Sequence, residues 1–79
     1  MLNLGRITPF RFSIKEIMTH YEISEDVASS VMATVIAKGS RVSINAARNY
    51  VRDQEKAGAY PRAVSDEICD LLDKFSKLR

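Results

Sequence analysis

Apolar residues near the C-terminus recur every three or four positions, and this spacing constrains the fold more than any other feature of the chain. The residues with this spacing are Val64, Ile68, Leu71, Leu72, Phe75 and Leu78. Because an α-helix has about 3.6 residues per turn, the pattern gives a helix one apolar face. Acidic residues come first, and Lys74 and Lys77 come last, as the helix dipole favours. We therefore predict a helix over residues 62–78, after a turn at Tyr60-Pro61.

A second helix is predicted to begin at Ser13. Ser13 and Glu16 have the spacing of a capping box, in which each side chain satisfies a free backbone N–H of the first turn. Phe12 and Ile17 have the spacing of a hydrophobic staple across the same helix start. These signals predict a helix over residues 13–21.

The segment before this helix, residues 1–12, is expected to be irregular. Pro9 has no backbone N–H and Gly5 is conformationally free, so no helix is expected to start there. If the segment is extended, Phe10 and Phe12 share one side and can pack onto the helices.

The next helix is predicted to be the most apolar one. Ser24 caps its start, and Gly39 offers a left-handed residue that ends it, which predicts a helix over residues 24–38. Its many apolar positions indicate a central, buried helix. The β-branched residues between Val31 and Ile36 leave a strand as the alternative.

A fourth helix, over residues 43–57, is bracketed by Ser43 as its cap and Gly58 as its stop. The expected fold is therefore all-α, a compact four-helix domain over residues 13–79 packed around the buried helix at 24–38.

One side of the helix at 43–57 carries basic and amide side chains at helical spacing. Arg48, Arg52 and Lys56 are four residues apart, which aligns them along about two turns and suits successive phosphates. The side-chain amides of Asn45 and Asn49 can each form a pair of hydrogen bonds with the edge of an adenine base. With a residue just before the helix, the predicted nucleic-acid-binding set comprises Arg41, Asn45, Arg48, Asn49, Arg52 and Lys56. This pattern predicts a small DNA-binding protein.

The alternative for this surface is an ordinary solvated face, partly neutralised by Asp53 and Glu55. The DNA-binding hypothesis requires the cationic groups to gather in one water-facing patch, and internal ion pairs would remove it. The length of the helix at 24–38 argues against a standard helix-turn-helix motif, because the supporting helix of that motif is usually shorter.

Three short segments resemble landmarks of archaeal-type histone-fold proteins. They are Thr8-Pro9-Phe10, Ile23-Ser24-Glu25-Asp26 and Val64-Ser65-Asp66-Glu67-Ile68. The resemblance implies a short, a long central and a short helix, in a protein that dimerises and binds DNA. This sequence departs from the pattern, because Gly39, Ser40 and Ser43 interrupt the central helix and the spacing is several residues too long. The chain is therefore not assigned to that family.

Catalytic, metal and cofactor sites are not expected. His20 and Cys69 are the only soft metal ligands and fall on different predicted helices, whereas zinc needs three or four ligands. Acidic neighbours disfavour a Cys69 thiolate. Asp66, Asp70 and Asp73 share a side that could meet a divalent cation, or the basic stripe of a second copy, but is most simply a solvated face. No glycine-rich phosphate loop occurs, so we expect neither an enzyme nor a small-molecule substrate.

Composition bounds the partners and the compartment. The 79 residues include 12 Lys and Arg against 10 Asp and Glu, and a net charge of +2 does not by itself establish a polyanion partner. The single cysteine excludes a disulfide framework and is typical of the cytoplasm. The longest uncharged stretch, Val27 to Ala37, has eleven residues, which is too short for a membrane span.

A core of this size supplies about 3–5 kcal/mol, so an added partner surface is favourable. The alternative function is therefore a non-enzymatic interaction or assembly module, either a homodimer or a small subunit of a complex. Its contact surface would be spare apolar surface on the helices at 24–38 and 62–78.

Overall fold

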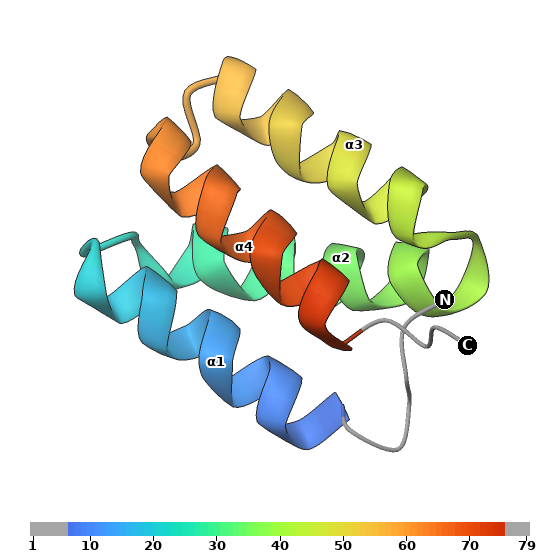
Figure 1. Cartoon of the computed structure of the whole chain (residues 1–79). Coiled ribbons are helices and arrows are strands. Elements are labelled where there is room, and N and C mark those ends of the chain that lie inside the picture. The colour runs from blue at the N-terminus through green and yellow to red at the C-terminus, as the bar shows by residue number, and fades with distance from the viewer. Residues whose placement is uncertain (1–6, 76–79) are drawn as a thin grey trace.

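The computed structural model describes residues 7–75, and within that range it contains four α-helices and no strand (Figure 1). The helices are α1 (Ile7–His20), α2 (Glu25–Arg41), α3 (Ile44–Lys56) and α4 (Arg62–Phe75). Each helix packs on the next, and α4 returns to α1. The all-α, four-helix prediction is confirmed. Residues 76–78 of the predicted last helix lie outside the described residues, as do residues 1–6 of the predicted irregular segment.

Two contacts at opposite ends of α1 set its antiparallel course along α4. The ring of Phe10 meets the ring of Phe75 edge-on, with centroids 5.6 Å apart. At the other end, the hydroxyl of Tyr21 donates a 2.6 Å hydrogen bond to Glu67, and this bond is the main cause of the raised pKa of Tyr21. The start of α1 therefore lies beside the end of α4, as Figure 1 shows.

The core is made by one face of every helix. As expected, α2 packs against α1 and α3, but α4 contributes at least as many buried residues as α2 does. The apolar stripe predicted for the last helix is used inside the chain, because Val64, Ile68, Leu72 and Phe75 are all buried. Leu71 is the one described residue of the stripe that stays half-buried, so most of the stripe is not the spare outer surface that the assembly hypothesis placed on that helix.

The start of α1 corrects the prediction for residues 7–12. The helix begins at Ile7, and Pro9 lies in its first turn, where no intrahelical N–H bond is needed. Ser13 is therefore inside the helix and not its cap. Residues two apart point to different sides of a helix, so Phe10 is fully buried while Phe12 is 63% exposed.

The end of α2 corrects the prediction that Gly39 stops the helix. The helix continues to Arg41, and Gly39 is buried within it. Glycine in a helix costs about 1 kcal/mol relative to alanine, a cost that close packing can outweigh. The chain turns later, where the N–H groups of Val42 and Ser43 both donate to the Lys38 oxygen at 2.9 Å.

The predicted caps of α2 and α3 are confirmed. The Ser24 hydroxyl accepts from the Val27 N–H at 3.4 Å, and the Ser43 hydroxyl accepts from the Ala46 N–H at 3.0 Å. Gly58 ends α3 with a left-handed φ of 91°. The following bonds, from Gly58 to Glu55 and from Ala59 to Gln54, complete a Schellman motif.

The break between α2 and α3 also bears on the histone-fold landmarks. Residues 42 and 43 separate two helices of 17 and 13 residues, where that family has one continuous central helix. The described part of the chain therefore lacks the feature that the resemblance implies.

Candidate functional site

The six predicted nucleic-acid-binding residues differ in their exposure to solvent and in the direction in which they point. Asn45, Asn49 and Lys56 are exposed on the outer side of α3, and Arg41 is exposed in the last turn of α2. The remaining two are Arg48 and Arg52, which are half-buried and turned toward α4.

Arg48 forms an ion pair with Asp73 of α4 through one terminal nitrogen. Its side chain is only 37% exposed, whereas the Asp73 side chain is 62% exposed. The Nε atom of Arg48 is enclosed and has no hydrogen-bond partner among residues 7–75. The guanidinium therefore lies against the protein surface, with its charge matched by a carboxylate from the neighbouring helix.

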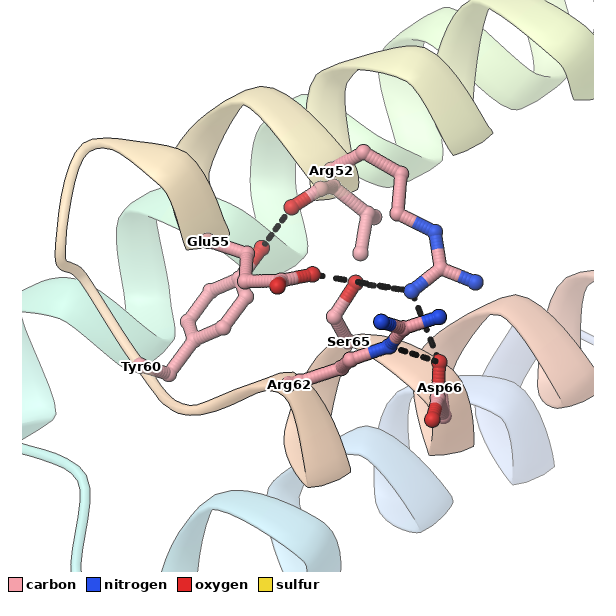
Figure 2. A network of polar contacts seen from close by, with 7 residues as sticks. Arg52, Glu55, Tyr60, Arg62, Ser65 and Asp66 are labelled. Carbon is pink, nitrogen blue, oxygen red and sulfur yellow. Dashed lines mark hydrogen bonds and ion pairs between the residues drawn. The ribbon is translucent and has the colours of Figure 1, made fainter.

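Arg52 is the centre of a second polar cluster between α3 and α4 (Figure 2). One terminal nitrogen donates to Asp66 at 2.7 Å and to the Ser65 hydroxyl at 3.0 Å. The same nitrogen lies 3.5 Å from Glu55, and Arg62 approaches Asp66 at 3.9 Å. The hydrogen bond with Asp66 is the main cause of the raised pKa of Arg52.

These contacts divide the predicted basic stripe. Its two central arginines are matched by Asp73 and Asp66, so the stripe is not a continuous free cationic surface. The condition set by the DNA-binding hypothesis, free gathered guanidinium groups, is not met at Arg48 and Arg52. The acidic stripe of α4 meets the basic stripe within one chain through Asp66 and Asp73, whereas the sequence favoured a solvated acidic face and offered a contact with a second copy only as an alternative.

Two residues of this cluster were not singled out as site residues by the sequence. Ser65 lies inside the predicted last helix, and the structure shows that it is fully buried and accepts the Arg52 hydrogen bond. Tyr60 was a turn residue, but it is buried and donates to the Val51 oxygen. Neither role has a local sequence signal. The Ser65 contact depends on α4 lying beside α3, and the Tyr60 contact depends on the chain folding back onto α3 after it ends.

Cys69 lies in the core near this cluster and is 6% exposed. Burial is the main cause of its raised pKa, although Arg52 and Arg48 act in the opposite direction. The thiol form is therefore favoured, and a thiolate nucleophile is not supported.

A different surface stands out on α1. Among the described residues, the large hydrophobic side chains that are exposed are Phe12, on α1, and Val42, between α2 and α3. Phe12 belongs to two adjoining shallow hollows. One is lined by Phe12, Lys15, Glu16, Thr19 and His20, and the other by Thr8, Arg11, Phe12, Lys15 and Met32.

Beside these hollows, a groove of about 530 Å³ runs between α1 and α4. Ile17 and Leu71, both half-buried, contribute its apolar part. Glu16, Glu67 and Asp70 supply carboxylates along it, opposed by Lys74. The outer side of α1 thus carries a basic and aromatic region next to an acidic and apolar one.

Comparisons with known proteins assign this chain to no class. No family model matches the chain, and neither a curated protein nor a solved structure matches it. Within residues 7–75, no group of three or more His, Cys, Asp or Glu side chains is placed to hold a metal ion. No helix in the described range has both the length and the apolar character to cross a bilayer.

Proposed function

We propose that this chain is a non-enzymatic protein-interaction module whose contact surface is the outer side of α1. The observation that carries the proposal is Phe12, which is 63% exposed although Phe10 and Phe75 are buried. A partner that covers this phenyl ring with apolar surface removes it from water, which contributes favourably to binding.

The charges around Phe12 support a protein partner. Arg11 and Lys15 line the hollows beside the ring, and no carboxylate within residues 7–75 forms an ion pair with either of them. An apolar anchor with charged groups at its rim is a common plan for a protein contact. The surface therefore favours a partner that offers an apolar side chain and nearby carboxylates.

The contact surface can be tested by photo-crosslinking in cells. Replacing Phe12 with p-benzoylphenylalanine keeps an aromatic ring and makes the position reactive toward a bound protein. We expect a discrete protein adduct from position 12. p-Benzoylphenylalanine in place of Asn49, which is exposed on α3, is the matched control and should give no protein adduct. If position 12 yields no adduct, or no more than position 49, the proposal is wrong.

Nucleic-acid binding remains a second candidate function, favoured by the exposure of Arg41, Asn45, Asn49 and Lys56. Binding of a fluorescent duplex should then weaken steeply with salt, through counterion release.

Two substitutions make the test of this second candidate specific. Changing both Arg41 and Lys56 to Ala should reduce both duplex affinity and its salt slope, while Lys74→Ala on α4 should do neither. Absence of duplex binding at low salt would eliminate this candidate.

A further inference from the structure

Resting on the proposed function, we infer that the partner is a second copy of this chain, bound through antiparallel pairing of the two α1 helices. The outer residues of α1 that line one hollow are Phe12, Lys15, Glu16, Thr19 and His20. Their spacing of three, four and seven residues forms a continuous stripe along a helix. These side chains therefore lie on one face of α1, along which a second helix can be placed, with Phe12 as the large apolar group of that face.

The charges on this stripe complement those on an identical stripe that runs in the opposite direction. Lys15 and Glu16 are adjacent at its centre, and both are exposed. With a two-fold axis passing between them, Lys15 of each copy faces Glu16 of the other. A parallel arrangement would instead bring like charges together, so charge complementarity selects the antiparallel one.

The same axis provides cover for the exposed ring. Phe12 then lies opposite Thr19 of the second copy, close to where that copy's groove between α1 and α4 opens. The groove offers the apolar surface of Ile17 and Leu71. The two-fold symmetry covers both phenyl rings at once. It also gives a closed dimer, in which the contact surface of each copy is occupied by the other.

This arrangement uses surface that the fold itself leaves available. Within residues 7–75, neither Lys15 nor Glu16 takes part in an ion pair, whereas the arginines of α3 are matched by α4. Pairing through α1 therefore disrupts no intramolecular contact of these two residues. It also leaves the exposed side of α3 outside the dimer interface.

A charge-swap experiment tests the pairing by sedimentation velocity. Lys15→Glu alone, or Glu16→Lys alone, brings two like-charge contacts into the dimer, and each change should weaken dimerisation about tenfold or more. The double variant, Lys15→Glu with Glu16→Lys, recreates both opposite-charge contacts and should restore the dimer. Lys56→Glu on α3 is the matched control and should leave dimerisation unchanged. Circular dichroism checks that every variant keeps its helices.

The outcomes separate this inference from the proposed function. A wild-type protein that stays monomeric at its highest soluble concentration overturns the second copy as partner, as does a double variant no better than the single ones. If the crosslink from position 12 is then to a different protein, the interaction function stands and only the partner is wrong. If position 12 gives no crosslink at all, both fail.

Discussion

The hydroxyl of Tyr60 donates a 2.8 Å hydrogen bond to the backbone oxygen of Val51, which ties the connection after α3 back onto the helix that it leaves (Figure 2). Both residues are buried, and the left-handed Gly58 turns the chain between them. The contact directs α4 along α3. It thereby places the Ser65 hydroxyl 3.0 Å from a terminal nitrogen of Arg52, from which it accepts a hydrogen bond.

Tyr60→Phe removes this hydroxyl and keeps the ring. A net hydrogen bond is worth about 1 kcal/mol, so we expect the free energy of unfolding in urea to fall by about that amount. Tyr50→Phe is the matched control, because the half-buried Tyr50 has no side-chain hydrogen bond within residues 7–75 and should change stability little. Equal effects of the two substitutions would contradict the role given to the Tyr60 bond.

Stability should decline in alkaline solution. Burial raises the pKa of Cys69 from its ordinary 9.0, and burial also raises the pKa of Tyr60 from 10.0. Above those ordinary values the unfolded chain loses protons that the folded chain keeps, so the free energy of unfolding falls as pH rises. Urea denaturation should give little change from these two groups below pH 9.0 and a progressive loss above it.

Substitution separates the two contributions to this alkaline loss. Tyr60→Phe removes the tyrosine part and should flatten the curve above pH 10.0, whereas Cys69→Ala should act from pH 9.0. A pH profile that neither substitution alters would show that burial of these groups does not determine the alkaline limit.

Truncation should destabilise the fold strongly at Phe10 and very little at Phe12. Phe10→Ala removes a fully buried ring that packs on Phe75, and we expect a loss of about 3–5 kcal/mol, enough to unfold much of a domain this small. Phe12→Ala removes an exposed ring and should leave the monomer's stability almost unchanged. Thermal unfolding followed by circular dichroism measures both, and similar losses would contradict the helical start at Ile7.

The left-handed residues that follow α1 and α3 should both favour glycine. Glu22 has a φ of 57°, which costs a residue with a Cβ about 1–2 kcal/mol, so Glu22→Gly should stabilise the fold by up to about 1 kcal/mol. Gly58→Ala should destabilise it by about 1 kcal/mol. Apart from Gly58 and its two chain neighbours, no described residue has an atom within 4 Å of the added Cβ, so that cost arises from the backbone conformation. Stability changes of the reverse sign would contradict these turn geometries.

The helices were predictable where their signals are local. Ser43 caps α3 through its own first turn, and Gly58 ends it through its own φ, so both could be read from neighbouring residues. Pro9 and Gly39 misled the prediction because each is tolerated in a helix when position or packing permits. Whether they are tolerated depends on helix position and tertiary contacts, which a short window of sequence does not contain.

The candidate site was less predictable for a related reason. Helical spacing correctly places Asn45, Asn49 and Lys56 on the exposed side of α3. It does not reveal that Arg48 and Arg52 lie at the edge of that side, where the acids of α4 reach them. Pairing between helices depends on their relative placement, and two amphipathic stripes on their own do not specify it.

Nuclear magnetic resonance of the ¹⁵N-labelled protein at increasing concentration shows whether two copies of this protein associate through the outer side of α1. Amide signals of Phe12, Lys15, Glu16 and Thr19 should shift together as the protein associates, while those of Asn49 and Lys56 stay in place. Concentration-dependent shifts confined to α3, or no shifts at all, would contradict this association through α1.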